Sequence, residues 1–62
     1  MTARRELVVA GALVRHQVRQ YLRALNIEWE EESLLGDDVW FGFEATDDQW
    51  SDVTAWVVRV TS

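Results

Sequence analysis

The chain has 62 residues, no cysteine, one histidine and a formal net charge of −5, from six arginines and eleven acidic side chains. This length is typical of one small domain with a limited core, and without cysteine the chain has no disulfide, thiol nucleophile or structural zinc site. The negative charge disfavours direct binding to nucleic acid and favours a basic partner.

Residues 3–25 are predicted to form a long amphipathic helix, because apolar side chains recur at steps of three and four. This apolar stripe consists of Leu7, Gly11, Val14, Val18, Tyr21, Leu22 and Leu25. At about 100° per residue, the arginines that precede Asn26 fall in one arc beside it, namely Arg4, Arg5, Arg15, Arg19 and Arg23. We expect them to serve solubility, to pair with the molecule's own carboxylates, or to orient it against a bipolar partner.

Asn26, Gly11 and the apolar run 7–14 each allow a further prediction about this first segment. Asn26 tolerates the left-handed conformation and is expected to end the helix. Gly11 within the apolar stripe indicates close packing against another element. The longest apolar run, residues 7–14, is too short to span a bilayer, so no membrane contact is expected.

Two segments, 27–34 and 39–45, alternate with period two and are rich in aromatic and β-branched residues, which predicts a β-hairpin with its turn at residues 35–38. In the register that pairs Trp29 with Phe43 and Glu31 with Phe41, one face is apolar except for Glu31 at its edge. The opposite face carries Glu28, Glu30, Glu32, Asp38, Trp40 and Glu44.

A capping box at residues 46–49 predicts the start of a second helix. The Thr46 hydroxyl and the Gln49 side chain can satisfy free backbone donors, while Asp47 and Asp48 favour the positive end of the helix dipole. The helix is expected to run from Asp47 to about Val60.

The predicted fold is α+β: a single domain over residues 1–62 in the order α-β-β-α, an antiparallel hairpin with both helices packed on one face. Trp40 is expected to be largely exposed, because it falls on the acidic face. A core this small indicates a marginal monomer, so a homodimer formed through hairpin edges or through Val9 and Leu13 is an alternative. The side chains expected to be buried together are Trp29, Phe41, Phe43, Trp50 and Val57.

The acidic face of the hairpin is the candidate binding surface. Residues on one face of a strand lie about 6.6 Å apart, so Glu28, Glu30 and Glu32 would form a row with a spacing of the same order as that of nucleic-acid phosphates. Trp40 among these acids favours a binding surface, because aromatic anchors dominate interface energetics. The alternative is a solvated outer face whose charges prevent aggregation.

Catalytic and metal chemistry is not expected. The letters Gly36-Asp37-Asp38 also occur in polymerases, where paired aspartates hold metal ions, but Gly and Asp equally supply turn conformations. We expect a turn, no metal and no cofactor, with a weak cation site near Glu30, Glu32 and Asp38 as the alternative. No nucleophile has a base within sequence reach, so the chain is not expected to be an enzyme.

The exposed carboxylates and small size resemble, at the level of class, the phage-encoded inhibitors that mimic DNA, including anti-CRISPR and anti-restriction proteins. The resemblance implies a bacterial cytoplasmic protein whose acidic surface occupies the nucleic-acid-binding cleft of a basic partner. The implied binding residues are Glu28, Glu30, Glu32, Asp37, Asp38, Trp40, Glu44, Asp47, Asp48 and Asp52. The alternative function is that of a small self-associating structural or regulatory protein whose acids serve solubility only.

Overall fold

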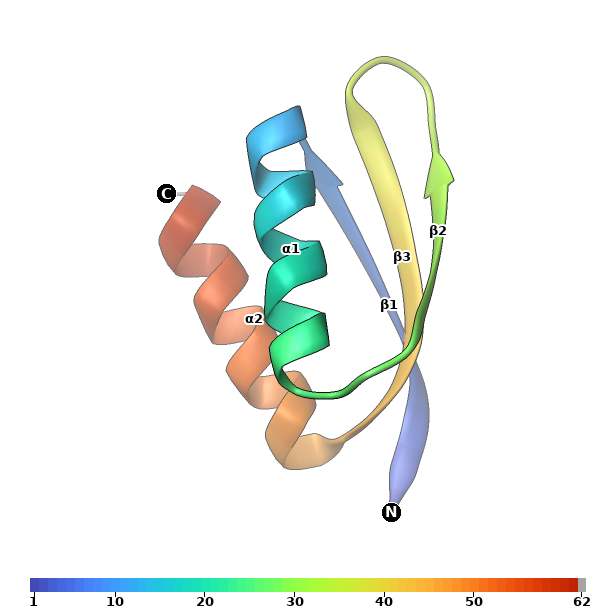
Figure 1. Cartoon of the computed structure of the whole chain (residues 1–62), viewed down its shortest axis with the longest axis vertical. Coiled ribbons are helices and arrows are strands. Elements are labelled where there is room, and N and C mark those ends of the chain that lie inside the picture. The colour runs from blue at the N-terminus through green and yellow to red at the C-terminus, as the bar shows by residue number, and fades with distance from the viewer. Residues whose placement is uncertain (62) are drawn as a thin grey trace.

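The computed structural model describes residues 1–61, which form an α+β fold with three antiparallel strands and two helices (Figure 1). The element order is β1 (Thr2–Ala10), α1 (Ala12–Ala24), β2 (Trp29–Ser33), β3 (Asp38–Thr46) and α2 (Asp47–Thr61). The strand order in the sheet is β1-β3-β2, so β3 lies between two strands that α1 connects. This is a split β-α-β arrangement followed by a second helix.

The predicted α-β-β-α order is wrong because the first eight residues of the expected helix, 3–10, belong to β1 instead. β1 pairs with β3 along its whole length, from Thr2 opposite Thr46 to Ala10 opposite Asp38. Local helix propensity is a weak preference, and a central strand that can bond on both edges overrides it. The expected arc of five arginines is therefore divided between β1 and α1.

Gly11 ends β1 and begins α1 with a backbone φ of +97°. A side chain at that φ would be strained, whereas a Cβ at this position would meet nothing within 4 Å. Close packing at Gly11 was therefore a wrong expectation: glycine serves the turn between strand and helix. Asn26 has the left-handed conformation expected of it, with φ 59°, just after the end of α1.

The predicted hairpin register is confirmed. Trp29 lies opposite Phe43 and Glu31 lies opposite Phe41, so the assignment of side chains to the two faces of β2 and β3 is also correct. Edge pairing through β3 is excluded, because β1 occupies the edge of β3 that a two-stranded hairpin would leave free.

The core lies between the sheet and the two helices. Val18 and Leu22 of α1 and Val53 of α2 are buried together with the odd-numbered residues of β3. Among the side chains expected in this core, Phe41 and Phe43 are fully buried, whereas others are half-buried and pack against it. The half-buried members are Trp29, Trp50 and Val57. We refer to this side of the sheet as the covered face.

The capping box at the start of α2 is confirmed in both directions. The Gln49 backbone N–H donates to the Thr46 hydroxyl at 3.1 Å, and the Thr46 N–H donates to the Gln49 side-chain oxygen at 3.0 Å. α2 begins at Asp47 as predicted. In residues 1–61, neither helix has the length and apolar character needed to cross a membrane.

We expect Thr46→Ala to lower the free energy of unfolding by about 1 kcal/mol, because it leaves the Gln49 N–H without its acceptor. Denaturant unfolding measures this change. Thr54→Ala in the same helix is the matched control: the Thr54 hydroxyl donates to helix carbonyl oxygens and caps nothing, so this change should leave stability unaltered or slightly raised. Equal effects of the two substitutions would contradict the capping role.

Candidate binding surface

The face of the sheet that lies opposite the two helices, here called the open face, is predominantly acidic. It consists of the even-numbered residues of the three strands. The odd-numbered residues of these strands lie on the covered face. Five exposed carboxylates and one exposed arginine share this face with a half-buried tryptophan, which lies between the exposed Val8 of β1 and Glu32 of β2. The charged residues and the tryptophan are Arg4, Glu6, Glu30, Glu32, Asp38, Trp40 and Glu44.

The structure brings five of the ten predicted binding residues onto the open face, namely Glu30, Glu32, Asp38, Trp40 and Glu44. Glu28 precedes β2 and lies at the end of the sheet, so the predicted row of three glutamates on one strand is only partly formed. Asp37 lies in the turn, where its carbonyl oxygen accepts a hydrogen bond from the Gly11 N–H at 3.1 Å. The other predicted residues, Asp47, Asp48 and Asp52, belong to α2 in the other layer.

Gly42 forms the floor of the open face. A Cβ placed at this position would lie 2.4 Å from the Trp40 ring and 2.7 Å from an Arg4 guanidinium nitrogen. Both side chains therefore lie over the glycine, and Gly42 itself is buried although it belongs to the open face. Trp40 was expected to be largely exposed, but the close approach of its ring to Gly42 leaves it half-buried.

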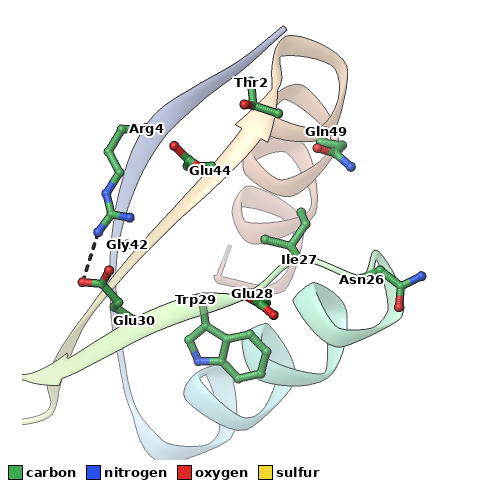
Figure 2. A pocket seen from close by; sticks show the side chains of 10 residues that line it. All are labelled: Thr2, Arg4, Asn26, Ile27, Glu28, Trp29, Glu30, Gly42, Glu44 and Gln49. Atoms are coloured by element: carbon green, nitrogen blue, oxygen red, sulfur yellow. Dashed lines mark ion pairs between the residues drawn. The ribbon is translucent and has the colours of Figure 1, made fainter.

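A hollow of about 550 Å³ adjoins this floor where the chain before β2 separates from β3. Figure 2 shows Arg4 and Glu30 pointing toward each other across Gly42, with their charged atoms 3.2 Å apart, while Glu28 and Glu44 lie around the same hollow. The Arg4 and Glu30 side chains are 49% and 70% exposed, so this ion pair contributes little to stability. Arg4 does, however, offset part of the negative charge at one end of the open face.

We expect Gly42→Ala to displace the Trp40 ring, because the added methyl group would occupy the space of that ring and of the Arg4 guanidinium. Two-dimensional NMR of the indole N–H groups measures this. The Trp40 signal should shift most, while those of Trp50 and Trp56, which pack on the covered face, should move little. A uniform shift of all indole signals, or none, would contradict the proposed position of Trp40.

On the covered face, Glu31 is the centre of an ion cluster with α1. The Arg15 and Arg19 Nε–H groups each donate to its carboxylate at 2.7 Å, and the Trp29 indole N–H donates at 3.2 Å. The hydrogen bonds from Arg19, followed by those from Arg15 and Trp29, lower the pKa of Glu31 from its ordinary value of 4.5 to about 2. The side chain is only 14% exposed, so its charge depends on these partners.

The arginines of α1 are thus part of the structure. Arg15 and Arg19 hold Glu31, and the Arg23 guanidinium lies 5.9 Å from the centre of the Trp29 ring. Of the roles expected for the arginines, pairing with the molecule's own carboxylates is observed here. Glu31, which the sequence placed unfavourably at the edge of the apolar face, is satisfied by these arginines from the neighbouring helix.

Arg5 has a similar role between β1 and α2. It points to the covered face, where its guanidinium pairs with Asp47 and lies 5.7 Å from the centre of the Trp50 ring. Asp47 therefore serves the contact between the first strand and the second helix. Its pairing with Arg5 places it in the structure of the domain rather than on the open face.

Sequence reasoning missed Glu6 and Arg4 as members of the open face. Both were assigned to a helix, whereas in β1 they lie beside Gly42 and Glu44 of the central strand. The signals that could have revealed β1 are the β-branched pair Val8 and Val9 and the glycine that follows them at position 11. These three residues separate a strand from a helix within an apparently continuous apolar pattern.

The open face offers negative charge and an aromatic surface. Across residues 1–61, no group of three or more His, Asp or Glu side chains is placed to hold a metal ion, and Glu30, Glu32 and Asp38 are not gathered into one. Comparison with protein families, with curated proteins and with solved structures found no match to this chain.

Proposed function

We propose that this protein is a non-enzymatic inhibitor that binds, through its open face, the basic nucleic-acid-binding site of a partner protein. The observation that carries the proposal is the composition of that face: five exposed carboxylates, one arginine and Trp40, on the side of the sheet that the helices leave uncovered. As in the DNA-mimicking inhibitors of phage, such a surface would act in the cytoplasm of a bacterial cell.

The charge distribution supports a basic partner. Glu30 and Glu32 lie on one face of β2, about 6.6 Å apart, a spacing of the same order as that of phosphates along a nucleic-acid strand. Glu6 of β1 and Asp38 and Glu44 of β3 add three more carboxylates on neighbouring strands, which lie about 4.8 Å apart. A positively charged cleft would be attracted to these carboxylates, and the attraction would raise the association rate. Nucleic acid itself would be repelled by the same charges.

Trp40 supplies the apolar part of the proposed interface. Its ring is already held over Gly42, so little conformational entropy is lost when a partner covers it. Protein interfaces commonly place an aromatic residue that contributes much of the binding energy within a rim of polar residues, and Trp40 with the nearby acids has this arrangement. The acidic side chains near Trp40 would orient the partner as it binds. Burial of Trp40 would lengthen the lifetime of the complex.

The test is capture of partners from nuclease-treated bacterial lysate on the immobilised protein, followed by elution with duplex DNA. If the protein mimics DNA, basic nucleic-acid-binding proteins should be retained and duplex DNA should release them, because the DNA and this protein would compete for the same cleft. The variant with Glu32→Gln and Glu44→Gln should lose this capture, since both side chains are exposed on the open face. Raising the salt concentration should also weaken capture by the unaltered protein.

The matched control is the variant with Asp48→Asn and Asp52→Asn, which changes the net charge by the same amount on exposed side chains of α2. It should retain capture. If both variants lose capture equally, net charge rather than the open face is responsible, and if DNA releases nothing, mimicry is wrong. Charge reversal at Arg15 or Arg19 is unsuitable as a control, because both hold Glu31.

A further inference from the structure

The two edge strands of the sheet, β1 and β2, differ in how readily each could pair with an additional strand. β2 is five residues long and contains three consecutive glutamates, features that protect an edge from pairing. β1 is nine residues long and ends in an apolar segment that includes Val8, which is 53% exposed. Among residues 1–61, β1 bonds to β3 alone, so alternate N–H and C=O groups along its outer edge face away from the sheet. β1 is therefore the edge available for strand addition.

The second helix presents apolar surface on the side of this same edge. α2 faces α1 with Trp56, which stacks on Tyr21, and faces β1 with Trp50, which lies beside Arg5. Val58 follows Trp50 by two intervals of four residues, so it lies on the same side of the helix, and it is 66% exposed. A strand added beside β1 would pass beneath this side of α2 and reduce its exposure to water.

We propose that a second copy of this chain occupies the edge, with the two β1 strands antiparallel around a two-fold axis between the Arg5 residues. Opposite residues in an antiparallel pair point to the same face, which limits the registers available to such a dimer. The register with Arg5 opposite its symmetry mate sets Arg4 opposite Glu6 of the second copy, twice per dimer. Registers shifted by two residues in either direction also keep the two faces aligned. One of them sets Arg4 opposite Arg4 of the second copy, and the other sets Glu6 opposite Glu6.

This charge complementarity is what identifies a second copy as the occupant. In the same register Leu7, half-buried in the single chain, lies opposite Ala3 of the second copy, and Val8 lies opposite Thr2. Each Arg5 keeps its own Asp47 partner, which offsets the repulsion at the axis. Arg4 exchanges its exposed pairing with Glu30 for Glu6 of the second copy. The result is a continuous six-stranded sheet with both open faces on the same side. The inference does not rest on the proposed function, because an edge dimer forms whether or not a partner is bound.

Sedimentation equilibrium at an ionic strength of about 0.15 M, where the Debye length is about 8 Å, tests the proposal. We expect a mass of twice the 7.2 kDa chain. Glu6→Arg should raise the dimer dissociation constant about tenfold, since both symmetric pairs become repulsive, and adding Arg4→Glu should restore dimerisation. A monomeric mass for the unaltered chain at high micromolar concentration, or a dimer insensitive to Glu6→Arg, would overturn it.

Disulfide trapping tests the register independently of affinity, and the chain contains no cysteine of its own. Thr2→Cys and Val8→Cys chains mixed under oxidising conditions should form a mixed disulfide, because opposite residues lie about 5 Å apart. Each variant oxidised alone is the control, since its two cysteines would be about 20 Å apart in this register. Equal cross-linking in the mixture and in the controls would contradict pairing through β1. Circular dichroism of every variant checks that it remains folded.

Discussion

Phe41→Ala is expected to unfold most of the protein at 25 °C. The Phe41 side chain is 0% exposed at the centre of the middle strand, and truncating such a residue costs about 3–5 kcal/mol. A domain of this length has a free energy of unfolding of about 3–9 kcal/mol, so the substitution would remove much or all of that free energy. Denaturant unfolding followed by circular dichroism provides the measurement.

Trp40→Ala is the matched control, because it removes a larger side chain from the neighbouring residue on the opposite face. Trp40 is half-buried over Gly42 and does not belong to the core between sheet and helices. Its truncation should cost clearly less than that of Phe41 and leave the chain folded. If Trp40→Ala were the more destabilising change, the assignment of the two faces would be wrong and the open face would lose its role.

Glu31→Gln is expected to lower the free energy of unfolding by about 2–3 kcal/mol. The amide has one acceptor oxygen and no negative charge, so Arg15 and Arg19 are left as neighbouring like charges without their shared counterion. Glu32→Gln makes the same chemical change at the next residue, which is exposed on the open face, and should alter stability by less than about 0.5 kcal/mol. Similar effects of the two changes would contradict the Glu31 cluster.

The same carboxylate makes stability depend on pH in a defined window. Because folding lowers the pKa of Glu31 from 4.5 to about 2, the unfolded chain binds its proton first as the pH falls. The stabilisation is complete above about pH 5 and disappears as the pH decreases toward 2, for a total of up to about 3 kcal/mol. Unfolding measured between pH 5 and pH 2 should show this decrease in the unaltered protein and a shallower one in Glu31→Gln. Identical slopes would show that other carboxylates cause it.

For β2 and β3, local pattern was enough to predict the structure. Large apolar residues at every second position, Ile27 and Trp29 in one segment and Val39, Phe41 and Phe43 in the other, favour the register in which they share a face, and a one-residue shift would expose them. The start of α2 was equally predictable, because Thr46 and Gln49 satisfy each other's backbone donors within four residues. Each of these features depends on contacts close in sequence or on the period of side chains along a strand.

β1 and the pairing of Glu31 were decided by the tertiary structure. The residues of β1 have no strong preference for a strand, and they form one because β3 offers an unpaired edge whose paired residues lie 28 to 44 positions further along the chain. That pairing brings Arg4 and Glu6 onto the open face, and the return of α1 over the sheet brings Arg15 and Arg19 to Glu31. Local sequence determines which side a residue takes within its element. Which elements meet, and therefore which charges neutralise one another, is determined by packing between distant segments.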